Sequence, residues 1–343
     1  MNRARLCLLA SCAVLFLAAA PDLHEGGRWW TFYVTAPGKA QALTGAENPE
    51  TGLVGLIGKA ERYVHAAFYE VSAPAVVEAL CRARGRGVEV QLVIETDTLK
   101  KRGKVMRRFE DAGIEVVTDA RRGLMHNKFA VVDGTWLWNG SYNATLNDAW
   151  KNNNNALAIR SPGLAEIYEA EFTEMFRDRV FGNRKEPGPF ANLGKKYYVS
   201  VESTDINAYF SPEDNIERII IKRIEKAKTS IHFMAFSFTS SGIGEAMIAK
   251  FKKGVAVTGI FERRGTREAH SQYAKMKLEG LPVRLDHNRC NMHHKVIVID
   301  GELVIMGSYN YSRNANLAND ENILIIDNRE IAARYLDEFK RLW

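Results

Sequence analysis

Cysteine is scarce in this sequence. The chain has four cysteines in 343 residues, too few for the disulfide framework that holds small secreted folds together. No Cys-x-x-Cys pair and no cluster of cysteine and histidine has the spacing of a zinc site. We therefore expect no structural metal, no metal or cofactor in the functional site, and a fold stabilised by its hydrophobic core.

A strong excess of one charge is also absent. Lysine and arginine number 47 against 41 aspartates and glutamates, so the formal net charge is +6. Two of the positive charges, Arg3 and Arg5, lie in a stretch that we expect to leave the mature protein. This balance is not that of a dedicated nucleic-acid-binding protein. The 46% of hydrophobic residues excludes a disordered chain, and the length favours about two domains.

The chain has one long hydrophobic run, from 6 to 20, which follows positively charged residues and ends at Pro21-Asp22. This order is typical of a secretory signal peptide. A transmembrane helix needs about 20 apolar residues, so the run is short for a membrane span. We predict a signal peptide or N-terminal anchor at 1–20, a lead-in segment at 21–40, and an exported protein, periplasmic or secreted. Leu9-Ala10-Ser11-Cys12 resembles a lipoprotein box and leaves lipidation open.

A shift of 167 positions superimposes the two halves of the chain. Between 123–159 and 290–326, 15 of 37 positions are identical. The repeat predicts a first domain at 41–176, a linker at 177–207 that contains Pro187-Gly188-Pro189, and a second domain at 208–343. Two equal copies imply a pair related by a pseudo-two-fold axis. Polar groups that both copies retain are then expected to converge at the interface.

Each copy alternates helix and strand. In the second copy, isoleucines at helical spacing predict a helix over 216–227, and further helices are expected over 243–252 and up to 279. Buried strands are expected over 230–237, 255–261, 281–285 and 296–299, and a last one over 304–305 after an Asp300-Gly301 turn. The alternation predicts an α/β fold of two tandem α/β/α sandwich domains, with the functional site between them.

Two motifs occur once in each copy at this same offset. The first is His-x-Lys-x4-Asp, with His126, Lys128 and Asp133 in one copy and His293, Lys295 and Asp300 in the other. The second is Gly-Ser-x-Asn, which contains Ser141 and Asn143 in the first copy and Ser308 and Asn310 in the second. Residues two apart on a strand face the same side, so the histidine and lysine of each copy point into one space.

Two imidazoles and two ammonium groups in one site suit phosphate chemistry. Lysines, together with serine and asparagine side chains, can bind the non-bridging oxygens and stabilise a five-coordinate transition state. One imidazole can attack phosphorus while the other protonates the leaving oxygen and later deprotonates water. The lysines supply the positive charge that a metal would otherwise bring. Asp133 and Asp300 each precede glycine, so a catalytic role and a structural role in a turn are both open.

The paired motifs resemble those of the phospholipase D superfamily, and the resemblance extends over about residues 41–343. It implies two phospholipase D-like domains with one motif each, a covalent phosphohistidine intermediate and independence from metal ions. It also implies that the nucleophile comes from the N-terminal motif. His126 is then the nucleophile, and His293 is the general acid and base.

One position near the motifs differs in charge between the copies. Glu321 lies where relatives in this superfamily use an acidic residue to bind a catalytic histidine, and its counterpart in the first copy is Asn154. A carboxylate stabilises an imidazolium, whereas an amide only orients the ring. The sequence leaves open whether Glu321 contacts His293 in its own half or His126 across the interface. Only the second arrangement supports His126 as the nucleophile.

Basic residues lie after the second strand of each copy and just before each motif. They are Lys100, Lys101, Arg102, Lys104, Arg107, Arg108, Arg121 and Arg122 in the first copy, and Arg263, Arg264, Arg267 and Arg289 in the second. Such a rim suits either a phospholipid at an anionic membrane surface or a strand of nucleic acid. A solvated helix face is the alternative interpretation of the first group.

Four functions fit these observations. The first hypothesis is a phospholipase D-type hydrolase of phospholipid headgroups, with transfer to another alcohol as a further outcome. The alternative is an exported nuclease that uses the same residues. A cardiolipin synthase-like transferase and a non-catalytic binding protein follow, and the two intact motifs disfavour the last. Both half-sites lie in one chain, so we expect a monomer.

Overall fold

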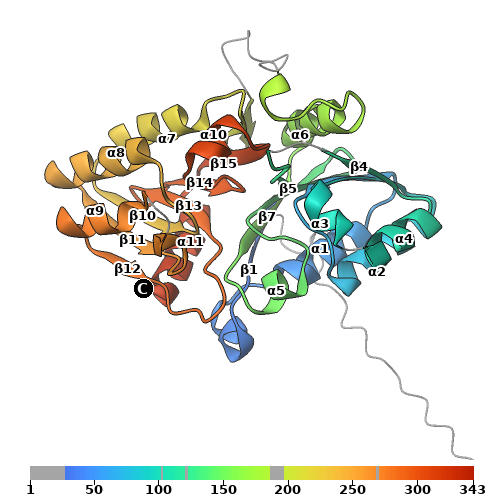
Figure 1. Ribbon diagram of the computed structural model, residues 1–343, viewed down its shortest axis with the longest axis horizontal. Helices are drawn as coiled ribbons and strands as arrows, with labels where there is room; N and C mark the ends of the chain where they lie inside the picture. The colour runs from blue at the N-terminus through green and yellow to red at the C-terminus, as the bar shows by residue number, and fades with distance from the viewer. Residues whose placement is uncertain (1–27, 102, 120–122, 186–196, 268–269) are drawn as a thin grey trace, which may run out of the picture.

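Two α/β domains lie side by side in the computed structural model, which describes residues 28–101, 103–119, 123–185, 197–267 and 270–343 (Figure 1). The predicted signal peptide, the Pro187-Gly188-Pro189 segment and the basic residues Arg102, Arg121 and Arg122 lie outside the described residues. Within the described ranges, no helix combines the length and the apolar character that crossing a membrane requires.

The first domain is built on a seven-stranded sheet with the strand order β1-β7-β6-β5-β2-β3-β4. Its strands are β1 (Trp30–Val34), β2 (Tyr63–Phe68), β3 (Glu89–Ile94), β4 (Glu115–Thr118), β5 (Lys128–Val132), β6 (Trp136–Gly140) and β7 (Asn155–Arg160). Its helices are α1 (Pro49–Gly58), α2 (Pro74–Gly85), α3 (Thr96–Lys100), α4 (Gly103–Asp111), α5 (Leu146–Trp150) and α6 (Pro162–Phe176). Strands β2, β3 and β4 are parallel, and helical crossovers connect them.

The second domain has the same strand order in an eight-stranded sheet, β8-β9-β15-β14-β13-β10-β11-β12. Its strands are β8 (Tyr198–Val201), β9 (Thr204–Ser211), β10 (Ser230–Ala235), β11 (Ala256–Phe261), β12 (Val283–Leu285), β13 (Lys295–Ile299), β14 (Leu303–Gly307) and β15 (Glu321–Asp327). Its helices are α7 (Ile216–Glu225), α8 (Ser241–Lys252), α9 (Gln272–Leu278), α10 (Arg313–Leu317) and α11 (Arg329–Leu342). The predicted α/β fold of two tandem domains is confirmed.

Strand β1 of the first sheet, and β8 with the first half of β9 in the second sheet, lie outside the repeat that the sequence predicted. Strand β1 pairs with β7 through Phe32 and Leu157, and β9 pairs with β15 through Ala208 and Leu324. Leu157 and Leu324 are 167 positions apart, but Phe32 and Ala208 are 176 apart. The first domain therefore includes part of the predicted lead-in segment, and β8 and the start of β9 lie in the predicted linker. Because β1 and β9 are 176 positions apart, a comparison of the two halves at the constant offset of 167 does not align them.

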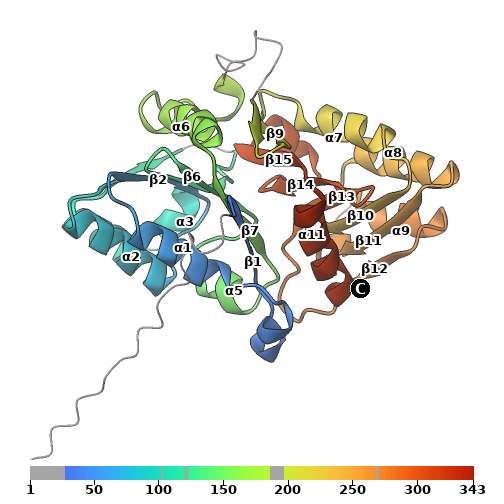
Figure 2. The same ribbon diagram turned by 180° about the vertical axis from the view of Figure 1, so that it is seen from behind.

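Each sheet has one face toward its own outer helices and one face toward the other domain (Figure 2). In the first domain, Ala66 and Phe68 pack with α1 and α2, whereas Ala67 between them packs with α6. The second domain divides in the same way, with α7 and α8 outside and α11 inside. The inner cluster is continuous and joins Phe129 of the first domain to Tyr335 of the second. This shared apolar core holds the two half-sites in a fixed relation.

Candidate active site

Both histidines of the predicted site lie at the interface between the domains. His126 and His293 stand two residues before β5 and β13. The His126 amide donates to the Asp320 carbonyl (2.9 Å), and the His293 amide donates to the Asn153 carbonyl (2.8 Å). The backbone of the opposite domain therefore holds each histidine, and the repeat offset relates the two contacts. The two motifs meet at the interface, as the repeat predicts.

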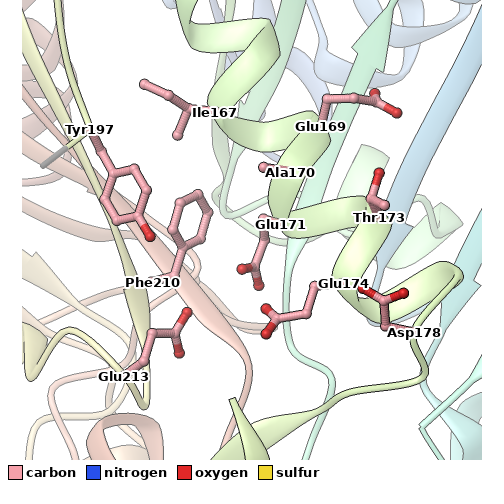
Figure 3. A pocket seen from close by; sticks show the side chains of 10 residues that line it. All are labelled: Ile167, Glu169, Ala170, Glu171, Thr173, Glu174, Asp178, Tyr197, Phe210 and Glu213. Atoms are coloured by element: carbon pink, nitrogen blue, oxygen red, sulfur yellow. The ribbon is translucent and has the colours of Figure 1, made fainter. Parts of the chain in front are cut away.

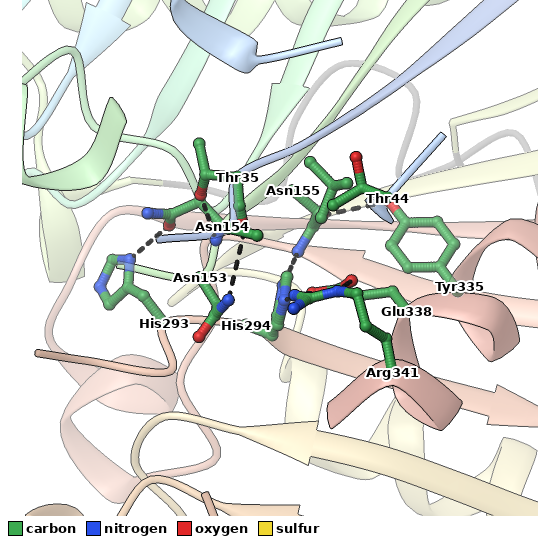
Figure 4. A network of polar contacts seen from close by, with 12 residues as sticks. Thr35, Thr44, Asn153, Asn154, Asn155, His293, His294, Tyr335, Glu338 and Arg341 are labelled. Atoms are coloured by element: carbon green, nitrogen blue, oxygen red, sulfur yellow. Dashed lines mark hydrogen bonds and ion pairs between the residues drawn. The ribbon is translucent and has the colours of Figure 1, made fainter. Parts of the chain in front are cut away.

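The partners of the two imidazole rings also come from across the interface, and they differ. His126 Nδ1 lies 2.7 Å from Glu321 Oε2, and His293 Nδ1 lies 2.8 Å from Asn154 Oδ1 (Figure 4). Both partners are acceptors, so Nδ1 of each neutral ring carries the proton and Nε2 is the basic nitrogen. Of the two arrangements that the sequence left open for Glu321, the structure has the contact with His126.

Lys128 and Lys295 are buried beside the histidines, with exposures of 0% and 2%. Each ammonium group donates to the carbonyl of the histidine two residues before it, at 2.6 Å for Lys128 and 2.7 Å for Lys295. An ammonium group has three N–H donors, so each lysine retains donors for a ligand. Because a buried charge is unfavourable unless it is paired, two buried lysines in one site indicate an anionic ligand.

Burial and charge shift the pKa values of all four groups downward. Burial lowers the pKa of His126 to about 4 with help from the lysines, although Glu321 opposes the shift. Burial, Lys295 and Lys128 lower the pKa of His293 well below its ordinary value. Burial lowers the pKa of Lys128 to about 8, and burial together with the charge of Lys128 lowers that of Lys295. Without a ligand, both imidazoles are therefore neutral at pH 7 and the site attracts a phosphate.

An aromatic ring covers each histidine-lysine pair. Tyr69 follows β2, and its ring centroid lies 5.0 Å from that of His126 and 5.3 Å from the lysine Nζ. Phe236 follows β10 at the equivalent position, 4.6 Å from the His293 ring and 4.7 Å from the other lysine. Ring faces stabilise the ammonium groups and exclude water. Neither ring is among the predicted site residues, although aromatic residues at matching positions after matching strands are a visible signal.

The aspartates of the two motifs do not reach the site, which corrects the catalytic role that the sequence left open. Asp133 and Asp300 follow β5 and β13, at the ends far from the histidines. Both have positive φ, 55° and 54°, as in the Asp-Gly turns of tight hairpins. Asp133 accepts from the Arg62 amide at 2.8 Å and Asp300 from the Thr229 amide at 2.7 Å, each among several such bonds. Their role is to close these turns.

Ser141 and Asn143, which the sequence predicts to bind phosphate, bind protein groups of the first half-site. Ser141 Oγ donates to Asn154 Oδ1 at 3.0 Å, so it orients the amide that contacts His293. Asn143 Nδ2 donates to Asp148 Oδ2 at 2.7 Å. Asn143 Oδ1 is buried and has no partner among the described residues. The donor that we expected to face the substrate is therefore used inside the protein.

Ser308 and Asn310 occupy the matching places in the second half-site. Ser308 Oγ accepts from the Asn322 amide at 3.0 Å, while Asn310 Oδ1 is buried without a partner in the described part of the chain. The glycine before each serine is needed because the backbones approach closely. A Cβ on Gly140 or Gly307 would lie 2.2 or 2.3 Å from a carbonyl oxygen of the neighbouring strand. Phosphate binding by these residues stays a prediction.

A separate acidic cluster lies near the start of the linker. Carboxylate oxygens of Glu171, Glu174 and Glu213 lie within 4.8 Å of one another, beside a pocket of about 410 Å³ between α6 and β9 (Figure 3). Lys185 Nζ binds Glu171 and lies 3.4 Å from Asp320 Oδ1 of the second domain. The lysine offsets the acidic charge, so this cluster ties the domains together beside the site.

The family model described as "Cardiolipin synthase, PLD-like domain" matches the chain twice, at residues 53–176 and 220–343. The two matched segments have the same offset of 167 positions as the repeat, and each contains one histidine-lysine motif. The chain belongs to the phospholipase D superfamily. Its two tandem domains are phospholipase D-like domains.

Relatives of this phospholipase D-like chain have names that describe phosphodiester cleavage. "Phospholipase D" of Rickettsia prowazekii is 30% identical over 170 residues, which cover 49% of this chain and 80% of the relative. "Mitochondrial cardiolipin hydrolase" of Xenopus tropicalis is 36% identical over 118 residues, which cover 34% of this chain and 56% of the relative. The phosphatidylserine synthase structure of Haemophilus influenzae has a TM-score of 0.65 over 90% of this chain and 85% of its own, at 13% identity, and shows the shared fold. The protein is a phosphodiester hydrolase.

Hydroxyl groups at the ends of β1 and β9 support this phospholipase D-like site, and Figure 4 shows the first of them, Thr35. Thr35 follows β1, and its Oγ1 accepts from the Asn154 amide at 2.7 Å and donates to the Asn152 carbonyl at 2.9 Å. Ser211, at the end of β9, donates to the Asn319 carbonyl at 3.3 Å. Neither hydroxyl is among the predicted site residues, because only the second offset of 176 positions aligns them.

Part of the predicted basic rim lies beside the phospholipase D-like site. Arg264 donates to Asn291 Oδ1 at 3.1 Å and to the Arg289 carbonyl at 3.0 Å, just before the second motif. Arg108 of the first copy binds Glu78 on α2. The solvated helix face is therefore the better interpretation for Arg108, whereas Arg264 contacts the segment that leads into the second motif.

Proposed function

We propose that the protein hydrolyses the headgroup phosphodiester of a phospholipid through a covalent phosphohistidine on His126, without a metal ion. The observation that carries this proposal is the 2.7 Å contact between Glu321 Oε2 and His126 Nδ1. The carboxylate keeps the proton on Nδ1 and leaves Nε2 unprotonated for attack on phosphorus. It also stabilises the positive charge of the phosphorylated ring. The equivalent partner of His293 is the neutral amide of Asn154, which suits the role of general acid and base.

In the first step, His126 Nε2 forms a bond to phosphorus. The bond from phosphorus to the headgroup oxygen breaks, and this oxygen takes a proton from His293 Nε2. Lys128 and Lys295 donate to the non-bridging oxygens, whose negative charge grows in the transition state. The charge of the bound diester opposes the lysines that lower the pKa of His293, so that ring gains its proton when substrate binds.

In the second step, water releases the product. His293 Nε2, now without its proton, takes one from water as the water oxygen bonds to phosphorus. The bond from phosphorus to His126 Nε2 breaks, and its electron pair returns to the ring. The products are a phosphate monoester and the starting form of the site, so one pair of histidines serves both steps.

Exposed apolar side chains beside the site favour a lipid substrate. Leu146 and Trp150 on α5 are 51% and 50% exposed, and Leu317, the counterpart of Trp150 on α10, is 52% exposed. Both helices follow a Gly-Ser-x-Asn segment and precede the residues that bind the histidine of the other domain. Tryptophan and leucine suit the boundary between lipid headgroups and acyl chains, and Arg264 nearby suits an anionic surface.

The substrate class is tested by offering three substrates in parallel, each with and without EDTA. They are phosphatidylcholine vesicles, vesicles that contain cardiolipin, and single-stranded DNA. We expect headgroup release from the vesicles at a rate that EDTA leaves unchanged. Loss of activity with EDTA would contradict the metal-free mechanism, and cleavage of DNA alone would replace the lipid hydrolase by the nuclease. Adding a primary alcohol measures how far transfer competes with hydrolysis.

Export and a monomeric state belong to the same proposal. The predicted signal peptide at 1–20 supports export, and the two half-sites in one chain support a monomer. Sequencing the N-terminus of protein recovered outside the cytoplasm tests the first point. Light scattering of the purified protein tests the second.

A further inference from the structure

Asp148 on α5 is a buried carboxylate that the two steps above do not use. Its repeat counterpart is Ala315, whereas the counterpart of Glu321 is Asn154. Each of these two buried acids, with exposures of 4% for Asp148 and 0% for Glu321, therefore has an uncharged counterpart in the other half. The two acids lie at different positions of the repeat, so symmetry does not relate them.

The Asp148 carboxylate lies beside the His293 ring and has several donors of its own. Its Oδ2 is 3.9 Å from His293 Nδ1. The same oxygen accepts from the Asn143 amide at 2.9 Å and from Asn143 Nδ2 at 2.7 Å, and Oδ1 accepts from Asn152. Asn154 Nδ2 donates to the Asp148 carbonyl at 3.3 Å. These bonds satisfy the buried carboxylate and fix its position beside the ring.

The other titratable groups that face His293 oppose a positive charge on its ring. Besides burial, the groups that lower its pKa are Lys295, Lys128, His126 and His294. Glu321 is bonded to His126 instead, and the direct partner of His293 is the neutral amide of Asn154. Asp148 is therefore the one acid within 4 Å of this ring in the described part of the chain.

We propose that Asp148 is a positioning residue that favours the protonated form of His293, so that this histidine can act as the general acid. The inference rests on the proposed function. When the bond from phosphorus to the headgroup oxygen breaks, that oxygen takes the proton of His293 Nε2, so the ring must be positive beforehand. Two lysines disfavour that charge, and the carboxylate at 3.9 Å opposes them.

The different placement of the two acids fits the different tasks of the two histidines. Glu321 contacts the His126 ring directly, which suits a nucleophile whose positive charge lasts as long as the intermediate. His293 must gain and lose a proton in every turnover. The direct partner of His293, Asn154, is neutral, and the Asp148 carboxylate lies farther away. The ring therefore gains affinity for the proton but can still release it in each turnover.

The variant D148N tests this role, because it keeps the shape of the side chain and removes its charge. Rapid-quench measurements follow phosphoenzyme formation from two phosphodiesters, one with an alkyl alcohol and one with p-nitrophenol as the leaving group. An alkoxide needs a proton as it leaves, whereas p-nitrophenolate does not. We expect D148N to slow the alkyl ester about tenfold at pH 8, which corresponds to a shift of about one pKa unit, and the aryl ester less than about twofold.

The pH profile adds a second readout. Both esters lose rate at high pH as Lys128 loses its proton, and Asp148 contributes to the pKa of that lysine. The alkyl ester alone also needs the proton of His293, so we expect D148N to shift the fall of the alkyl ester to lower pH by about one unit relative to that of the aryl ester. In the double variant D148N/N154D, a carboxylate returns next to the ring, so the fall moves back toward higher pH. The matched control is D337N, which removes the same charge from α11, where Asp337 is 62% exposed. We expect it to change neither rate.

Three results overturn the inference. Equal slowing of both esters with no shift of the pH profile would mean that Asp148 only stabilises the loop. Wild-type rates in D148N would mean that its charge is irrelevant to His293. No phosphoenzyme in the wild-type protein with either ester would remove the proposed function and this inference together, and the wild-type measurement alone identifies that case.

Discussion

The His126 and His293 half-sites are built from the same strand, turn and loop, yet they differ in charge. The backbone contacts to the opposite domain, the buried lysines and the covering aromatic rings are all equivalent. The partners of the rings are not, since Glu321 binds one and Asn154 binds the other. In this repeat fold, the shared scaffold places the groups, and the few positions where the copies diverge assign their roles.

Replacing each histidine in turn is the strongest way to break the comparison. H126N removes the nucleophile, so we expect turnover to fall by at least about 10⁴-fold and no labelled phosphate to be trapped on the protein. H293N removes the general acid, so turnover falls by about 10² to 10⁴-fold. With a p-nitrophenyl ester, H293N still traps phosphate. Trapping in H126N but not in H293N would reverse the two roles.

The ring partners are expected to show a smaller but clear difference. E321Q removes the charge that stabilises the phosphorylated ring of His126, and we expect a loss of about 10² to 10⁴-fold in kcat. N154A removes the neutral hydrogen bond to His293, of about 1 kcal/mol, together with the bonds of Asn154 to Ser141 and to the Asp148 carbonyl, so we expect a loss of about tenfold. Steady-state kinetics on the same vesicles measures both. Equal losses would mean that the charge of Glu321 has no special part in the reaction.

The pH dependence sharpens the comparison further. His126 must be neutral to attack, and its pKa is about 4, so kcat/KM falls as the pH drops through about 4. Lys128 must be charged, and its pKa is about 8, so kcat/KM also falls as the pH rises through about 8. Since Glu321 raises the pKa of His126, E321Q moves the acid limb to lower pH. An acid limb that moves upward in E321Q would contradict the contact.

Substitutions of the motif aspartates are expected to change activity least. Asp133 and Asp300 lie in equivalent turns, at the ends of β5 and β13 that are far from the histidines. D133N and D300N weaken the bonds to backbone amides, so each lowers the free energy of unfolding by about 1–2 kcal/mol. We expect kcat to stay within about twofold of wild type. Urea unfolding and kinetics on the same samples measure the two quantities. A large loss of kcat at unchanged stability would restore a catalytic role.

The sequence predicts most of the scaffold because the repeat doubles every signal. The α/β fold and the convergence of the two histidine-lysine pairs follow from motifs that recur at one offset. Strands β1 and β9 were not predicted as a pair because they align at an offset of 176 positions instead of 167. A comparison at the offset of 167 therefore does not align them, although β9 is an eight-residue strand inside its sheet.

The finer parts of the site depend on which side chains meet across the interface. A comparison of the two copies in the sequence does not reveal these contacts. The sequence showed that Glu321 and Asn154 differ, but the ring that each contacts follows from the crossed backbone pairing. Asp148 was visible as a position where its counterpart, Ala315, has no charge. Its importance depends on a distance of 3.9 Å between segments 145 residues apart.

The crossed contacts also bear on how such a site can evolve. If two identical chains formed the interface, any substitution would appear in both half-sites at once, and a change that helps one histidine would burden the other. With both copies encoded in one gene, residue 154 and residue 321 mutate independently. Joining the copies therefore allows one histidine to specialise in bonding to phosphorus and the other in carrying protons.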